Sequence, residues 1–151
     1  MDAAFALQDA YAPGNICFGC GPANPRGLQI KSFPDGDEVV CDYQPEDHHQ
    51  AFPGFVNGGI IGALFDCHMN WTAAYHLMTD HLPFTVTAEY AVKLRKPTPS
   101  GMRLHLRAHV TESTGNKAAV AATLEADGEV CAEATGLFVA VGEDHPAHQR
   151  W

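Results

Sequence analysis

Residues 58–79 form a segment that is apolar on nearly every face of a helix, and this feature constrains the fold more than any other. Asn57 is a suitable N-cap, because its side-chain oxygen can accept a backbone N–H of the first turn, and "DHLP" with Pro83 ends the segment. A helix that is apolar all round is buried rather than laid on a surface. The apolar positions are Ile60, Ile61, Ala63, Leu64, Phe65, Met69, Trp71, Ala73, Ala74, Leu77 and Met78.

Strand patterns flank this helix on both sides. "GLQIKSF" and "DEVVCDYQ" enclose the turn signal "PDG", and the polar run "PEDHHQAFPG" is predicted to be a loop that leads to the helix. Four further strands follow: "FTVTAEYAVKLRKP", "MRLHLRAHVTES", "KAAVAATLEAD" and "EVCAEATGLFVAV", with "STGN" and "DG" as hairpin turns. We therefore predict an α+β fold. One curved antiparallel sheet of about five to six strands, with its last four strands in a meander, wraps the long central helix, and a partner subunit covers the remainder.

Length and charge exclude several classes of protein. The 151 residues suit a single domain over residues 1–151, with a loop-rich lead-in over residues 1–26 and a solvated tail over residues 142–151. The net charge of -9 argues against a nucleic-acid partner, because binding phosphates needs a basic surface. Asn57, Asp66, His68 and Asn70 interrupt the apolar segment, so we expect no membrane span. A start without secretory features and five scattered cysteines predict a reduced, cytoplasmic protein.

Cys17 and Cys20 form a C-x-x-C pair, which raises the question of metal or redox chemistry. Structural zinc normally takes four ligands, and there is no second C-x-x-C pair. None of the histidines that we considered shows ligand spacing with the pair; these are His48, His49, His68 and His76. We therefore predict neither a metal nor a cofactor. A zinc-stapled interaction module built on the pair remains an alternative.

Asp66 is a carboxylate within the apolar helix. Isolated buried charges are costly, so this residue is paired, neutralised or functional, and its surroundings should raise its pKa. One helical stripe is formed by Gly58 or Gly59 together with Gly62, Asp66 and Asn70, and it could face a substrate channel or a neighbouring helix. A helix N-terminus presents unpaired N–H groups, and glycine allows close approach to them. The alternatives are a structural aspartate and glycines that serve only packing.

Two stretches of the chain resemble a known family. "PGFVNGGIIGALFD" followed by "TVTAEYAVKLRKPTPSG", with the lead-in "CFGCGPANPRGL", resembles the hotdog-fold acyl-CoA thioesterases of the phenylacetate-pathway (PaaI-like) and THEM-like branch. The hallmark of that branch is His-Gly-Gly at the helix start and an acid nine residues after the His. Asn57, Gly58, Gly59 and Asp66 occupy those places here. The resemblance implies at least a homodimer, with a dimer of dimers as the alternative, and metal-free active sites at the subunit interface.

The resemblance also implies catalytic roles. Gly58 of one subunit would stabilise the oxyanion through its backbone amide, beside Gly59, and Asp66 of the other would act as general base or as nucleophile. Asn57 replaces the usual His and cannot exchange a proton near neutral pH, so it polarises the carbonyl or only caps the helix. Thr87 would orient Asp66 or hold the attacking water, or it is an ordinary strand residue.

Substrate-binding positions follow from the same resemblance. Gln50 is the nearest match to a water-binding Asn of some relatives, although strict counting gives Ala51. A basic cluster after the helix would bind the phosphates of coenzyme A, or is only a solvated strand edge. The cluster consists of Lys93, Arg95 and Lys96, and the aromatic candidates for an acyl pocket are Phe52, Phe55 and Trp71.

The predicted function is hydrolysis of a small acyl- or aryl-CoA thioester at a dimer-interface site. One alternative is a hotdog protein that binds an acyl thioester or another small ligand without turnover. A second is hydration or dehydration of an enoyl thioester. That reaction usually needs an Asp–His pair near the helix start, which "NGG" does not supply.

Overall fold

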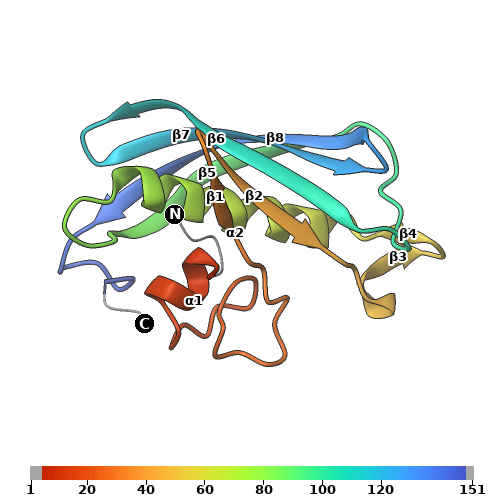
Figure 1. Cartoon of the computed structure of the whole chain (residues 1–151), viewed down its shortest axis with the longest axis horizontal. Helices are drawn as coiled ribbons and strands as arrows, with labels where there is room; N and C mark the ends of the chain where they lie inside the picture. Colours follow the sequence, from red (N-terminus) through yellow and green to blue (C-terminus); the bar gives the residue numbers. More distant parts are fainter. Residues whose placement is uncertain (1–4, 149–151) are drawn as a thin grey trace.

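The computed structural model describes residues 5–148, so the last residues of the predicted tail, 149–151, lie outside it. One long helix lies against a large antiparallel sheet (Figure 1). The elements are α1 (Leu7–Tyr11), β1 (Phe33–Asp35), β2 (Glu38–Tyr43), a 3-10 turn η1 (Asp47–His49), β3 (Gln50–Phe52), β4 (Phe55–Val56), α2 (Gly58–Leu77), β5 (Phe84–Leu94), β6 (Leu104–Thr114), β7 (Lys117–Ala126) and β8 (Glu129–Val141). The predicted α+β class, with one long helix against a sheet of six strands, is confirmed.

Helix α2 begins where the sequence predicts. The side-chain oxygen of Asn57 accepts hydrogen bonds from the backbone amides of Gly59 (2.7 Å) and Ile60 (3.2 Å), which satisfies two amides that the first helical turn leaves unpaired. The helix ends at Leu77, two residues before the predicted end at Thr79. Its buried residues lie on most faces, as the pattern requires, and include Leu64, Phe65, Met69 and Trp71.

The sheet has the strand order β1-β2-β6-β7-β8-β5, and every neighbouring pair is antiparallel. The three predicted hairpin turns are confirmed by residues with positive φ. These are Gly36 (63°) between β1 and β2, Gly115 (62°) between β6 and β7, and the pair Asp127 (54°) and Gly128 (79°) between β7 and β8. Two successive residues with positive φ match the twist of a two-residue hairpin.

The predicted four-strand meander is wrong at its first step. β5 pairs with β8 at the edge of the sheet, whereas β6 lies between β2 and β7. The connection over residues 95–103 contains two prolines and leaves the sheet. It pairs instead with the β3–β4 hairpin: the Val56 amide donates to the Thr98 carbonyl and the Ser100 amide to the Gly54 carbonyl, both at 2.9 Å. The chain therefore crosses the end of the sheet between β5 and β6.

Two local predictions also need correction. The run predicted as a loop before α2, residues 45–54, contains η1 and β3, and β3 forms a short hairpin with β4 directly after the run. The strand predicted from "GLQIKSF" is reduced to β1 at Phe33–Asp35, and Gln29, with a φ of 59°, interrupts the extended backbone before it.

The N-terminal segment, residues 5–32, covers the face of α2 that the sheet leaves open (Figure 1). Leu7, Ala12 and Ile30 are buried there, and the indole Nε1 of Trp71 donates to Cys20 Sγ at 3.3 Å. The sequence predicts that a partner subunit covers the part of α2 that the sheet leaves exposed. The lead-in of the same chain covers at least part of it, which explains how α2 can be apolar on so many sides.

A chain of buried polar groups fastens this segment to α2 and the sheet. Ser32 Oγ lies 2.8 Å from His68 Nδ1, and the other ring nitrogen of His68 lies 2.9 Å from the Val39 carbonyl oxygen. Gln8 Nε2 donates to Ser32 Oγ (3.0 Å), and Gln8 Oε1 accepts from the Ser32 amide (2.8 Å). Burial lowers the pKa of His68 to about 4, so the ring is neutral, donates to Val39 and accepts from Ser32.

None of the helices in the described part of the chain combines the length and the apolar character needed to cross a membrane.

Loss of the Ser32 hydroxyl should destabilise the protein. Ser32→Ala leaves His68 Nδ1 and Gln8 Nε2 buried without their partner, so we expect the free energy of unfolding to fall by about 1–3 kcal/mol in urea titrations. Ser113→Ala, which removes an exposed hydroxyl from β6, is the control and should change it by less than about 0.5 kcal/mol. Equal effects of the two substitutions would show that the buried polar chain does not contribute to stability.

Candidate active site

The stripe of small and polar residues on α2 faces β5, at the edge of the sheet. Asn70 and Asp66 meet Thr85 and Thr87: Thr85 Oγ1 donates to Asn70 Oδ1, and Thr87 Oγ1 donates to Asp66 Oδ1 at 2.6 Å. One turn further toward the N-terminus of α2, a Cβ at Gly62 would lie 3.4 Å from the Tyr90 hydroxyl. At Gly58 it would lie 3.5 Å from Leu94 Cδ1. The glycines therefore allow the first two turns of α2 to lie close to this strand.

A register shift in β5 aligns these contacts. Between Thr87 and Glu89 the pairing with β8 moves by one residue, so Ala88 is the extra residue of a β-bulge. Thr85 and Thr87 before the bulge face α2, and Tyr90 and Leu94 after it face α2 as well. Without the bulge, strict alternation would turn one of the two groups away from the helix.

Asp66 is half-buried and its carboxyl group is held at one oxygen. Burial raises the pKa of this carboxyl, the hydrogen bond from Thr87 opposes that rise, and the charge of nearby Cys17 adds to it. A raised pKa makes the carboxylate a stronger base than an exposed aspartate. Thr87 occupies Oδ1, so Oδ2 makes no hydrogen bond among the described residues and is available for a water molecule or a substrate.

The start of α2 is exposed in the single chain and presents one free amide. The amides of Gly59 and Ile60 donate to Asn57 Oδ1, whereas the Gly58 amide makes no hydrogen bond within residues 5–148. Asn57 is therefore a true N-cap, and its oxygen is used for that purpose. Its side-chain NH2 group has no hydrogen-bond partner among the described residues, so polarising a carbonyl remains possible for it.

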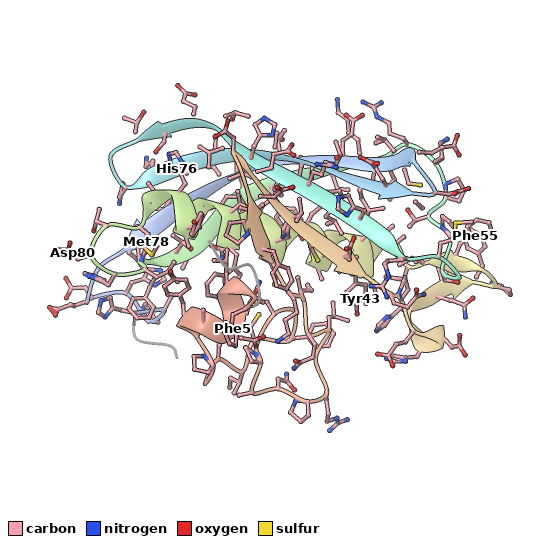
Figure 2. All side chains as sticks on the ribbon, viewed as in Figure 1. Phe5, Tyr43, Phe55, His76, Met78 and Asp80 are labelled. Carbon is pink, nitrogen blue, oxygen red and sulfur yellow. The ribbon has the colours of Figure 1, made fainter. Side chains whose placement is uncertain are left out.

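A groove of about 370 Å³ lies beside Gly58, between the β3–β4 hairpin and the connection after β5. Phe55, at the end of the molecule formed by that hairpin, lines it and stacks with Phe52 at 5.1 Å between ring centroids (Figure 2). Arg95 and Lys96 line the same groove and form exposed ion pairs with Glu133 (3.4 Å) and Glu129 (3.2 Å).

The remaining predicted residues lie elsewhere. Lys93 alternates with residues that face α2 and lines a second groove on the outer face of the sheet, beside Glu133 and Arg107. Trp71 is 4% exposed and belongs to the core. Gln50 is used structurally: its Oε1 accepts from the Gly54 amide at 2.5 Å, and its Nε2 donates to the Asp47 carbonyl at 2.8 Å, which closes the β3–β4 hairpin.

Sequence reasoning missed two residues near these groups. Thr98 lines the groove beside Gly58, and its buried hydroxyl has no hydrogen-bond partner among the described residues. Nothing in "KPTPSG" distinguishes it from an ordinary linker residue.

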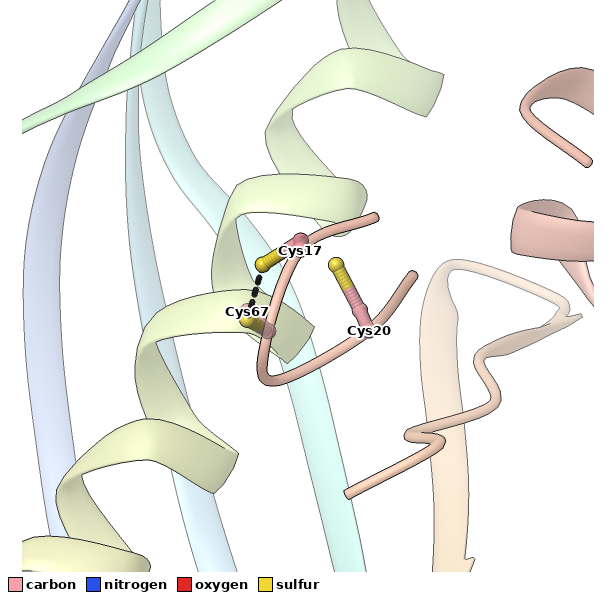
Figure 3. Close-up of side chains that lie close together, drawn as sticks. All are labelled: Cys17, Cys20 and Cys67. Carbon is pink, nitrogen blue, oxygen red and sulfur yellow. Dashed lines mark hydrogen bonds between the residues drawn. The ribbon is translucent and has the colours of Figure 1, made fainter. Parts of the chain in front are cut away.

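Cys67, next to Asp66 on α2, lies with Cys17 and Cys20, and the three sulfur atoms are within 4.8 Å of one another (Figure 3). No local sequence signal places Cys67 beside the C-x-x-C pair, which is 47 or more residues away along the chain.

Comparisons with known proteins agree with this architecture. No family model matches the chain. A thioesterase superfamily protein of Shewanella loihica PV-4, known as a crystal structure, is 30% identical, and the match covers 90% of this chain and 100% of that one with a TM-score of 0.72. A phenylacetic acid degradation-related protein of Ralstonia eutropha JMP134 shares the fold at 22% identity, with 81% and 92% of the two chains covered and a TM-score of 0.69.

A curated relative is also similar in sequence. The acyl-coenzyme A thioesterase THEM4 of Rattus norvegicus is 28% identical over 110 residues, which are 72% of this chain and 45% of the rat protein. The chain thus matches less than half the length of that relative. Together with the fold and the Shewanella loihica match, which covers that chain completely, this confirms the resemblance seen in the sequence: the chain belongs to the thioesterase superfamily and has the hotdog fold of that superfamily.

Proposed function

We propose that this protein hydrolyses small acyl- or aryl-CoA thioesters at a site shared by two copies of the chain. The observation that carries the proposal is the polarity of one face of α2. It holds the Asp66 carboxylate, oriented by Thr87 at 2.6 Å, and at its start the unpaired amide of Gly58. A base or nucleophile and an oxyanion donor are the two requirements of acyl transfer.

The two groups cannot serve one substrate within a single chain. Eight residues separate Gly58 from Asp66, and at 1.5 Å per residue this distance is about 12 Å along the helix. A reacting carbonyl needs both groups within about 3 Å of its own atoms. The second group must therefore come from another copy.

Pairing through β5 supplies that copy with the required geometry. β5 is an edge strand of 11 residues, and an unpaired edge is a template for another strand. Two β5 strands that pair antiparallel about a twofold axis place the Leu94 end of one beside the Thr85 end of the other. Gly58 lies at the first end and Asp66 at the second, so each Gly58 amide approaches the partner's Asp66.

In such a site the roles divide as follows. The Gly58 amide, at the positive end of the helix dipole, stabilises the charge that develops on the thioester oxygen. Asp66 either activates water or attacks the carbonyl carbon itself, and Thr87 orients it. Gly59 keeps its amide on the Asn57 cap and supports the helix start. Asn57 supplies only a hydrogen-bond donor, and the absence of an exchangeable proton there disfavours enoyl hydration.

The groove beside Gly58 supports a coenzyme A ester as the substrate. Phe52 and Phe55 offer apolar surface, the Thr98 hydroxyl offers an unused hydrogen bond, and Arg95 and Lys96 offer positive charge at the same groove. The rat relative is named as an acyl-coenzyme A thioesterase, which supports the same substrate class. Gln50 shapes the hairpin that forms one wall of the groove.

Removing the carboxylate should abolish most of the activity. We expect Asp66→Asn to lower kcat for free-thiol release from a panel of acyl- and aryl-CoA esters by about 10²–10⁴-fold, because the amide is neither base nor nucleophile. Asp42→Asn, on an exposed face of β2, is the matched control and should retain full turnover. Unchanged thiol release by Asp66→Asn would refute the assignment. Ligand retention without turnover by the unmodified protein would instead indicate a binding protein.

A mixed dimer tests whether the site is shared. Among residues 5–148, a Cβ at Gly58 would meet only Leu94 Cδ1, at 3.5 Å, so Gly58→Val should fold while it blocks access to the amide. We expect Gly58→Val and Asp66→Asn homodimers to be inactive, and an affinity-tagged heterodimer of the two to recover about half of the wild-type turnover, because one of its two sites is intact. A heterodimer as inactive as its parents, or a monomeric active enzyme, would contradict the shared site.

Substitutions at the two ends of the basic cluster should have different effects on KM for coenzyme A esters. Lys96→Ala is expected to raise KM for coenzyme A esters about 3–10-fold with little change in kcat, because Lys96 contributes to ground-state binding. Lys93→Ala is the control, since Lys93 lies on the other face of the sheet, and it should leave KM unchanged. Steady-state kinetics at low ionic strength would detect the difference. If Lys96→Ala raised KM no more than Lys93→Ala does, the coenzyme A phosphates would have to bind elsewhere.

A further inference from the structure

Three cysteines from two distant parts of the chain meet against α2. Cys17 and Cys20 lie on the N-terminal loop and Cys67 lies on the helix (Figure 3). Their sulfur atoms are within 4.8 Å of one another, and Cys17 Sγ is 3.8 Å from Cys67 Sγ. All three are free thiols. The proposed hydrolysis does not use them.

The loop is built so that its sulfur atoms turn toward the helix. The Gly21 amide donates to the Cys17 carbonyl at 2.9 Å, which closes a tight turn around the C-x-x-C pair. A Cβ at Gly19 would lie 2.4 Å from Cys67 Sγ, and one at Gly21 would lie 2.3 Å from the Cys17 nitrogen. Any side chain at either position would therefore disrupt the loop or the cluster.

N–H groups point at two of the sulfur atoms. Trp71 Nε1 donates to Cys20 Sγ at 3.3 Å. The backbone amides of Gly19 and Cys20 also donate hydrogen bonds to the Cys17 sulfur. N–H donors around sulfur are the outer shell that stabilises negatively charged thiolate ligands of a metal.

We propose that Cys17, Cys20 and Cys67 bind one zinc ion, or a divalent cation with a similar preference for sulfur, and that the ion fastens the N-terminal segment to α2. Each coordinating thiol gives its proton to solvent, so three thiolates and Zn²⁺ leave one net negative charge beside the N–H donors. A zinc ion with three protein ligands holds water at the fourth position. Cys17 and Cys67 are only partly buried, which leaves one side of the cluster accessible in the single chain.

The sulfur spacing is compatible with tetrahedral zinc coordination. Tetrahedral coordination with zinc–sulfur bonds of about 2.3 Å separates two ligands by about 3.8 Å, which is the spacing of Cys17 and Cys67. A disulfide needs about 2.05 Å between its sulfur atoms and would leave the third thiol without a function. A second group of possible metal ligands consists of Glu46, His48 and His49. It is less suitable, because His49 Nδ1 already accepts a hydrogen bond from the Glu46 amide at 3.0 Å.

Metal content of the whole chain is the first test. We expect protein purified without oxygen, reduced and supplied with zinc, to retain about one zinc per chain after gel filtration, as measured by plasma mass spectrometry. Replacement by cobalt should produce thiolate-to-cobalt charge-transfer absorption. Cys17→Ser and Cys67→Ser should lose both signals. Cys131→Ser, a buried cysteine on β8 that donates to the Glu129 carbonyl, should retain both.

A second measurement uses the unmodified protein, so that misfolding of a variant cannot hide the answer. X-ray absorption at the zinc edge should show three sulfur neighbours at about 2.3 Å and one lighter atom. A chelator should lower the melting temperature of the unmodified protein. No retained metal, fewer than three sulfur neighbours, full metal content in folded Cys67→Ser, or a disulfide among these cysteines after anaerobic alkylation would each overturn the proposal.

Discussion

The close packing of one face of α2 on the edge strand β5 is the constraint on which the candidate site depends. Gly58 and Gly62 allow the approach, and Asn70 and Asp66 bond across it to Thr85 and Thr87. These contacts are spaced by four residues on the helix and by two, three and four on the strand, where the spacing of three spans the bulge after Thr87. The geometry of Asp66 is thus a property of an element pair and not of one loop, which favours a precisely held carboxylate.

A helix that is apolar on most sides needs cover on most sides, and this chain supplies it from two sources. The sheet buries one side and the N-terminal segment buries much of the other, where the polar chain of Gln8, Ser32 and His68 replaces apolar packing with hydrogen bonds. The polar stripe escapes full burial because it lies at the sheet edge, between the two covers. The Asp66 carboxylate is therefore only partly removed from water, so its desolvation free energy is smaller than that of a fully buried charge. The hydrogen bond from Thr87 offsets part of what remains.

Local sequence signals predicted local structure well and long-range pairing poorly. Asn57 and the apolar run predicted the helix and its cap, and the turn residues Gly36, Gly115 and Gly128 predicted three hairpins, because these signals act over a few residues. The proximity of Thr87 to Asp66 followed from the family resemblance. The edge position of β5, the burial of Thr98 and the approach of Cys67 to Cys17 did not follow, since each depends on contacts between segments far apart in sequence, which no local pattern encodes.

The backbone bonds between the β3–β4 hairpin and residues 98–100 have a consequence for how the protein can diversify. β4 runs directly into the start of α2, and residues 98–100 follow the end of β5, so the two walls of the groove hold each other in place through Gly54 and Val56. A change in the length of either segment would therefore displace the other and alter the shape of the groove. Asp66 and Thr87 lie on a different pair of elements, α2 and β5, so such a change need not move them.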